Sequence, residues 1–227
     1  MLIIPITLGP LDTNCYIVQT GENEAVCIDP AAQSERVLLK DIPEKAAQAG
    51  LTIKKILLTH GHFDHTGAAE ELKKAYDPEP PIIVSRKDDE MMHGSGSEMK
   101  SLAFFAPKLA YNECVPDEYY EFDETGTATV TQGDVTFTVI ETPGHTAGSV
   151  CILCRDENGQ NIMFSGDTLF KDSIGRSDGF SGDTQTLYRS LDRLKALDGN
   201  YIIYPGHGES TTLDAERRYN PFLADFV

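Results

Sequence analysis

The sequence predicts an α/β fold, because strand-like apolar segments alternate with amphipathic helical segments in both halves of the chain. Its 227 residues can bury a sizeable core, and 40% hydrophobic with 24% charged residues is the composition of an ordinary globular protein. No linker, low-complexity tract or block of charge divides the chain. We therefore expect a single domain over residues 1–227, with helices covering the sheet faces.

The first half alternates strands and helices up to an irregular segment. A helix is expected from about residue 33 to residue 49, where apolar residues recur at helical spacing, and Pro43 should kink or divide it. A short helix is expected over residues 68–76. Residues 86–116 are less regular, and we interpret them as an insertion or lid with short helices of its own. Strands are expected at residues 2–8, 14–20, 25–29, 53–58 and 82–85.

The second half repeats the alternation. A helix over residues 184–197 presents four leucines on one face, which is the spacing of core residues. A short helix begins at Leu213 and ends at Pro221. Strands are expected at residues 119–122, 127–131, 135–141, 149–154, 161–164 and 201–204.

Charge and cysteine content exclude several classes of partner. With 36 acidic and 19 basic side chains, the net charge is −17, which argues against binding to nucleic-acid phosphates or to an anionic membrane surface. No apolar run approaches the roughly 18 residues of a transmembrane helix, and the N-terminus has no basic segment of a secretory signal. Five scattered cysteines do not form a disulfide framework. We therefore expect a cytoplasmic protein that acts on a small molecule.

Five of the six histidines follow strand-like runs, next to Gly or Pro. Three lie in Thr59-His60-Gly61-His62-Phe63-Asp64-His65, and the others are His145 and His207, each in a Pro-Gly-His segment. Asp167 follows the strand at 161–164 in the same way. Open α/β sheets bind ligands beyond the carboxyl ends of their strands, so these segments predict one shared site. His93 lies elsewhere, and we expect it to be solvated.

The number and type of these side chains predict a metal site. Gly61 lets the chain fold so that both neighbouring histidines face one ion. Seven donors are too many for one tetrahedral zinc, whereas two ions that share a bridging carboxylate use seven. Nitrogen and oxygen donors without thiolate suit zinc, iron or manganese and do not distinguish among them. We expect two divalent ions and take Zn²⁺ as the first candidate, with Fe or Mn as alternatives. The candidate donors are His60, His62, Asp64, His65, His145, Asp167 and His207.

Two Ser-Gly-Asp-Thr segments compete for the carboxylate role. The first follows a strand and presents Asp167 at the expected site. The second directly precedes the leucine-faced helix, where Asp183 has the position and chemistry of an N-cap. We therefore assign Asp167 as the ligand and Asp183 as the helix cap.

These residues resemble the metallo-β-lactamase superfamily, whose signature T-H-x-H-x-D-H stands unbroken at residues 59–65, followed in order by His145, Asp167 and His207. The resemblance implies a four-layer αββα sandwich with the metals at one edge. By this analogy His60, His62 and His145 bind the first metal, Asp64, His65 and His207 bind the second, and Asp167 bridges them.

Within that superfamily the chain is most similar to the short glyoxalase II-like hydrolases (hydroxyacylglutathione hydrolases), through residues 170–178 and 216–222. The similarity implies cleavage of a thioester such as S-lactoylglutathione by a metal-bound hydroxide, which Asp64 would orient. Arg176 is a candidate substrate contact, with a structural ion pair as its alternative role. Longer relatives continue into a helical domain that supplies part of the glutathione site, and this chain stops before it.

Two alternatives remain open from the sequence. A persulfide dioxygenase would hold a single iron through His60, His145 and Asp167. A metal-binding module without catalysis would use the same donors, and alanine at His62 and Asp64 would abolish turnover only in an enzyme. A secreted β-lactamase is not favoured, because no export signal is visible.

Overall fold

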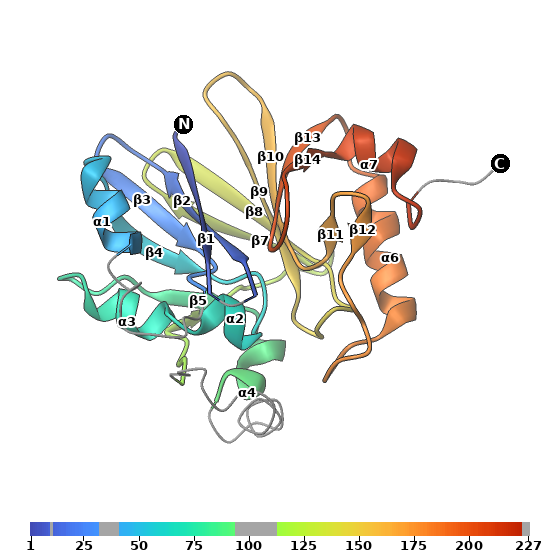
Figure 1. The fold of residues 1–227 in the computed structure, drawn as a ribbon, viewed down its shortest axis with the longest axis horizontal. Coiled ribbons are helices and arrows are strands. Elements are labelled where there is room, and N and C mark those ends of the chain that lie inside the picture. Colours follow the sequence, from blue (N-terminus) through green and yellow to red (C-terminus); the bar gives the residue numbers. More distant parts are fainter. Residues whose placement is uncertain (10, 32–40, 94–112, 224–227) are drawn as a thin grey trace.

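Two six-stranded sheets lie between outer layers of helices in the computed structural model, which describes residues 1–9, 11–31, 41–93 and 113–223 (Figure 1). Three hydrophobic clusters separate these layers: one between the first sheet and its helices, one between the sheets, and one between the second sheet and its helices. The four-layer αββα sandwich implied by the signature is confirmed.

The first sheet contains the N-terminal strands. Its first three strands pair antiparallel and the remaining ones parallel. On its outer face, Ile42, Ala46 and Leu72 of two helices pack against alternate side chains of the strands. In sheet order the strands are β1 (Ile3–Leu8), β2 (Thr13–Gln19), β3 (Glu24–Ile28), β4 (Thr52–Leu57), β5 (Ile82–Val84) and β6 (Glu118–Tyr119). The accompanying helices are α1 (Asp41–Gln48), α2 (Phe63–Thr66), α3 (Ala69–Lys74), η2 (Arg86–Asp88) and α4 (Asp89–Met92).

The second sheet contains the C-terminal strands, and α6 (Thr184–Lys195) and α7 (Leu213–Tyr219) cover its outer face (Figure 1). The leucine face of α6 is buried as expected, and the Asp183 carboxylate accepts a hydrogen bond from Thr186 N, so its role as N-cap is confirmed. In sheet order the strands are β14 (Thr211–Thr212), β13 (Tyr201–Pro205), β10 (Asn161–Gly166), β9 (Val150–Arg155), β8 (Val135–Glu141) and β7 (Thr127–Gln132). A small hairpin of β11 (Leu169–Phe170) and β12 (Ser173–Ile174) follows β10.

Strand residues alternate between the two faces of each sheet. Tyr16 and Val18 of β2 point to the core between the sheets, whereas Ile17 points to the helices. On β9, Cys154 lies between the sheets and Cys151 lies under α6. Both faces of these strands are buried, which explains their continuous apolar sequences.

Two segments expected from the sequence, the helix at 33–49 and the insertion at 86–116, are described only in part by the structure. The described part of the helix expected from residue 33 is α1, in which Pro43 is the third residue. Residues 33–40 of that expected helix lie outside the described residues, so the expected kink or division at Pro43 stays a prediction. The expected insertion at 86–116 contains η2 and α4, and its residues 94–112 lie outside the described residues.

Candidate metal centre

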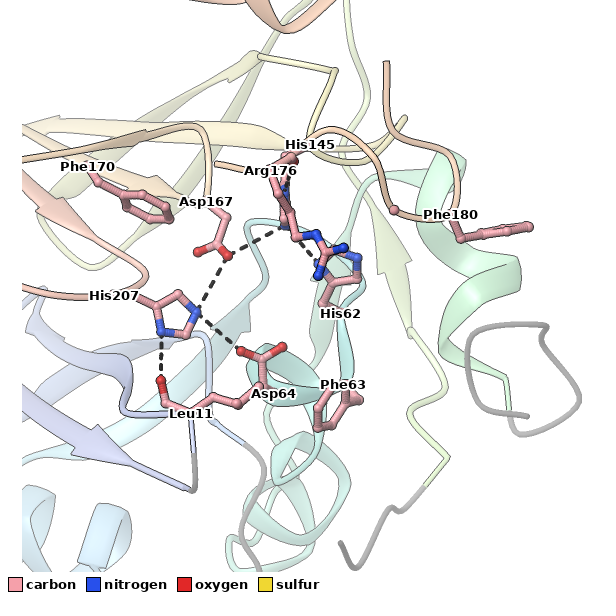
Figure 2. A pocket seen from close by; sticks show the side chains of 11 residues that line it. Leu11, His62, Phe63, Asp64, His145, Asp167, Phe170, Arg176, Phe180 and His207 are labelled. Atoms are coloured by element: carbon pink, nitrogen blue, oxygen red, sulfur yellow. Dashed lines mark hydrogen bonds and ion pairs between the residues drawn. The ribbon is translucent and has the colours of Figure 1, made fainter. Parts of the chain in front are cut away.

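Segments that follow four strands bring all seven predicted donor residues together. Figure 2 shows five of them, His62, Asp64, His145, Asp167 and His207. His60 and His62 lie on the loop after β4, and α2 carries Asp64 and His65. The segments after β8, β10 and β13 supply the other three, His145, Asp167 and His207.

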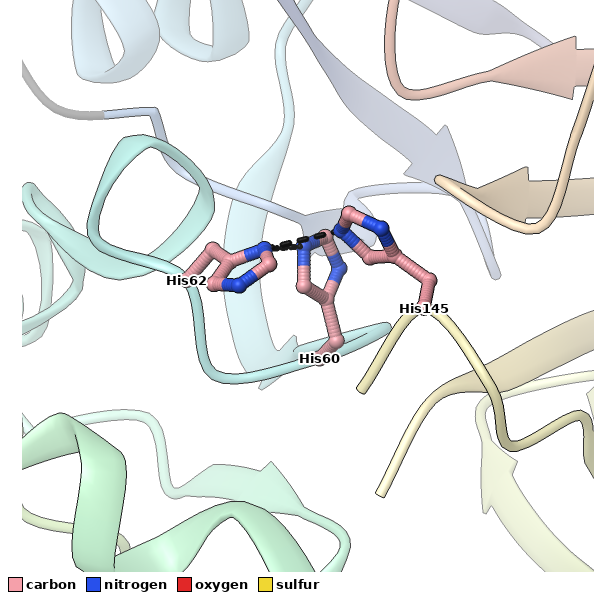
Figure 3. A group of neighbouring side chains, drawn as sticks. All are labelled: His60, His62 and His145. Carbon is pink, nitrogen blue, oxygen red and sulfur yellow. Dashed lines mark hydrogen bonds between the residues drawn. The ribbon is translucent and has the colours of Figure 1, made fainter. Parts of the chain in front are cut away.

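The first donor group is formed by His60, His62 and His145, which come from two different loops (Figure 3). The Nδ1 atom of His62 lies 2.9 Å from His60 Nε2 and 2.8 Å from His145 Nε2. His145 Nδ1–H donates to the carbonyl of Arg176 at 2.7 Å, so its Nε2 presents a lone pair. Three ring nitrogens therefore converge on one point.

Proton counting shows that hydrogen bonds alone cannot satisfy this group. Thr59 Oγ1 donates to Asp29 and therefore accepts from His60 Nδ1–H, which leaves His60 Nε2 as a second lone pair. His62 Nδ1 can donate at most one proton to the two lone pairs that face it. A divalent cation would be coordinated by all three nitrogens.

Asp64, His65 and His207 form the second donor group, and Asp167 lies between the two groups. His207 Nε2 is 3.3 Å from Asp64 Oδ2 and 3.5 Å from Asp167 Oδ2. The Asp167 carboxylate also lies 3.5 Å from His145 Nε2 and 3.3 Å from His65 Nε2. Asp167 thus reaches both groups, as a bridging ligand would.

Two buried atoms at this junction lack a hydrogen-bond partner. They are His65 Nε2 and Asp167 Oδ1, which lie 3.3 Å apart without forming a hydrogen bond. An imidazole nitrogen, once deprotonated, and a carboxylate oxygen are both ligands of divalent metal ions, so the residues present fit such ions.

Burial and mutual charge divide the histidines into two classes. Burial, followed by the nearby imidazoles, lowers the pKa of His60 well below its ordinary value and lowers the pKa of His62 to about 3. Burial also acts against protonation of His207, but hydrogen bonds to Asp167 and Asp64 outweigh it and raise its pKa to about 10. Burial opposes the charge of His65 too, yet Asp167, Asp64 and Asp29 raise its pKa well above the ordinary value.

The carboxylates of the site remain ionised. Burial would raise the pKa of Asp64, but His65 and the hydrogen bond from His207 lower it to about 2. The same balance between burial and the neighbouring histidines holds the pKa of Asp167 well below its ordinary value. Both carboxylates are therefore in the form that binds a metal ion.

Asp29 is a buried site residue that our sequence reasoning missed. Its carboxylate accepts hydrogen bonds from Thr59 N and Thr59 Oγ1 and lies 2.9 Å from His65 Nδ1. It thereby orients His65 and, through Thr59, His60. The sequence contains a pattern that could have identified it, because Asp29 follows the apolar run of β3 just as Asp167 follows β10.

Five of the seven donors, all except His60 and His65, line a cavity of about 540 Å³ whose other walls are largely apolar (Figure 2). Leu11, Phe63, Phe170 and Phe180 form this apolar rim. Arg176 also lines the cavity, and its guanidinium pairs with Asp178 at 2.8 Å. His93 lies near Asp89 and Glu113 and joins none of the donor groups found among the described residues.

Comparison with known proteins agrees with this geometry. Residues 8–207 match the profile of the Metallo-beta-lactamase superfamily. Hydroxyacylglutathione hydrolase GloC of Haemophilus influenzae is 35% identical over 222 residues, which cover 97% of this chain and 96% of GloC.

Two solved structures align along their whole length. The B3 metallo-beta-lactamase BLEG-1 matches with a TM-score of 0.83 and 30% identity, over 99% of this chain and 100% of its own. The di-iron-bound form of TTHA1623 matches with a TM-score of 0.77 and 37% identity, over 97% of this chain and 100% of its own.

Proposed function

Because the chain belongs to the metallo-beta-lactamase superfamily, we propose that it is a hydrolase that uses two divalent metal ions to cleave a thioester such as S-lactoylglutathione. The observation that carries the proposal is the placement of Asp167 within 3.5 Å of histidines in both donor groups. One ion is assigned to His60, His62 and His145, the other to Asp64, His65 and His207, with Asp167 shared. Bound there, divalent cations supply a hydroxide nucleophile near neutral pH and polarise the scissile carbonyl.

The side chains of the cavity have separate roles in this proposal. Asp64 lines the cavity as a carboxylate, and Thr13 Oγ1 holds it through a 2.9 Å hydrogen bond. We assign to Asp64 the orientation of the attacking water, in addition to its role as ligand. The apolar rim would receive the hydrocarbon part of the substrate and exclude bulk water.

The substrate assignment rests on the length of the region aligned with GloC as well as on its sequence identity. GloC carries the name hydroxyacylglutathione hydrolase, and 96% of it aligns with this chain. The region shared with GloC therefore spans nearly the whole of a relative with that name. Arg176 is the candidate contact for a carboxylate of glutathione, which would compete with Asp178 for the guanidinium.

We propose zinc as the resident metal, with iron as the alternative that the di-iron form of TTHA1623 supports. Both metals accept histidine nitrogen and carboxylate oxygen. Metal analysis of protein purified without added metal, combined with activity after reconstitution by each metal, decides between them.

The test is thiol release from S-lactoylglutathione by the purified protein, with and without a chelator. Rapid release that a chelator abolishes supports the proposal. Absence of release from a fully metallated sample rejects it. Oxygen uptake with a persulfide substrate, together with one iron per chain, would replace it with the dioxygenase alternative.

A second candidate activity, β-lactam hydrolysis, is supported by the alignment with the whole of BLEG-1, a B3 metallo-beta-lactamase. A lactam carbonyl requires the same nucleophile and electrophile as a thioester carbonyl. Hydrolysis of a chromogenic cephalosporin, measured on the same sample, compares the two activities directly. A higher kcat/KM for the cephalosporin than for S-lactoylglutathione would make β-lactam hydrolysis the first candidate.

A further inference from the structure

Asp88 is a buried carboxylate next to the site that is not one of the seven donors. It is 1% exposed and lies at the end of η2, outside every donor group formed by the described residues. Its hydrogen-bond partners among those residues are two backbone N–H groups and one hydroxyl, none of them charged. Such a buried charge is costly unless hydrogen bonds satisfy it, so its partners indicate its role.

The partners of Asp88 lie on the two loops that build the first donor group. One carboxylate oxygen accepts from Gly61 N at 2.9 Å, between His60 and His62. The same oxygen accepts from Thr146 Oγ1 at 2.7 Å, directly after His145. The other oxygen accepts from Gly148 N at 2.7 Å. One side chain therefore bridges both loops.

The two loops approach Asp88 and its neighbour Met91 closely at glycines. A Cβ atom on Gly148 would lie 2.5 Å from Asp88 Cγ, and one on Gly61 would lie 2.7 Å from Met91 Cγ. Both loops thus approach the η2–α4 segment through glycines, whose backbone N–H groups reach the carboxylate. Thr146 is itself held, since its N–H donates to Ser149 Oγ.

We propose that Asp88 is a positioning residue, which sets the spacing of the His60–His62 loop and the His145 loop for binding of the first metal ion. This inference rests on the proposed metal site and is independent of the substrate. All three partners donate to Asp88, so both of its oxygens must act as acceptors. An asparagine has one acceptor oxygen and would turn an N–H group toward another N–H or O–H group.

Asp88→Asn therefore keeps the size of the side chain and removes part of the bridge. The loops remain joined by the hydrogen bond from Val150 N to Thr59 O, so we expect the variant to fold. Glu90→Gln is the matched control, because Glu90 is exposed on the adjoining helix α4 and the change in charge is the same.

Two backgrounds separate positioning from general destabilisation. His207→Ala weakens the second donor group and His62→Ala weakens the first, so each background leaves one group with its full set of donors. The affinity for Zn²⁺ is measured by competition with a chromophoric chelator, and the unfolding midpoint of the metal-free protein is recorded alongside it. Removing a residue that orients ligands typically costs about 10–100-fold in metal affinity.

We expect Asp88→Asn to weaken Zn²⁺ binding at least tenfold in the His207→Ala background and less than twofold in the His62→Ala background. Glu90→Gln should change neither value. Equal loss in both backgrounds, or no loss in either, would overturn the proposal. Failure of the unsubstituted protein to bind Zn²⁺ would instead reject the metal site on which this inference rests.

Discussion

Four of the five clustered histidines form a hydrogen bond to another group of the chain through Nδ1, which turns Nε2 toward the site. The partners of Nδ1 are Thr59 Oγ1 for His60, Asp29 for His65, and the carbonyls of Arg176 and Leu11 for His145 and His207. Such contacts fix both the ring orientation and the position of its proton. The site is therefore arranged by the chain itself.

Asp29→Asn is predicted to weaken metal binding most at the second donor group, because Asp29 contacts His65 directly and reaches His60 only through Thr59. Asp29 has a φ of +50°, a conformation that asparagine tolerates, so the substitution changes the hydrogen bonds of His65 and Thr59 without straining the backbone. We expect about 10–100-fold weaker binding of one Zn²⁺ ion, measured by chelator competition. Asp12→Asn is the control, because Asp12 is exposed and has a φ of +52°. An equal loss in both variants would contradict this role.

Metal uptake is predicted to release protons at pH 7. The pKa of His207 is raised to about 10 and that of His65 is raised well above its ordinary value, so both are protonated in the metal-free protein at this pH. A metal ion binds only the unprotonated ring, so affinity should increase as the pH rises toward those values. Titration calorimetry in buffers of different ionisation enthalpy should show release of about two protons at the second donor group.

In the His207→Ala variant, the number of protons released should fall by about one. Release that does not change with this substitution would assign the protons to other groups.

At the level of elements, the site depends on where strands end. The segments after β4, β8, β10 and β13 were predictable because each combines an apolar run with a Gly or Pro and a donor residue. Helix α2 was not predicted, since its four residues are too few for any periodic pattern. The two-residue strands β11 and β12 were missed for the same reason.

The loop that carries His145 packs closely against α6 through Gly144. Its φ is +134°, and a Cβ atom there would lie 2.3 Å from the backbone of Leu187. We predict that Gly144→Ala lowers the free energy of unfolding by about 2 kcal/mol or more, through strain and displacement of α6. Urea denaturation of the metal-free protein measures this change.

Gly159→Ala is the matched control for that experiment. Gly159 also has a positive φ, +81°, but no atom lies within 4 Å of its added Cβ. Its substitution should cost about 1 kcal/mol. Equal losses at the two positions would show that backbone conformation, and not packing of the loop on α6, determines the effect.

The rim residue Phe180 offers a test of how substrate is held. It is 52% exposed at the mouth of the cavity, so replacement should not disturb folding. We predict that Phe180→Ser raises KM for S-lactoylglutathione several-fold with little change in kcat, since apolar contact contributes to ground-state binding. Phe222→Ser, at an exposed phenylalanine that does not line the cavity, should leave KM unchanged. A fall in kcat alone would contradict this role.

For the whole molecule, three apolar interfaces hold the sandwich and leave one edge to carry charged groups. Among the described residues, no helix is long and apolar enough to cross a membrane. The net charge of −17 does not conflict with the site, because two divalent cations would offset Asp64 and Asp167 locally.

The donor set was predictable from sequence because histidines are few and cluster in marked segments. The supporting carboxylates were not, since Asp29 and Asp88 are two among 36 acidic residues. Their role becomes visible only in the fold, where Asp29 lies against His65 and Asp88 spans two loops that are about 85 residues apart in the chain.

The measurement that tests the central claim most directly is a Zn²⁺ titration of the metal-free protein, with thiol release from S-lactoylglutathione recorded at each step. We predict an upward-curving rise that reaches its maximum at two equivalents per chain, and loss of activity on chelation. A linear rise that saturates at one equivalent, or absence of thiol release at two, would contradict the account.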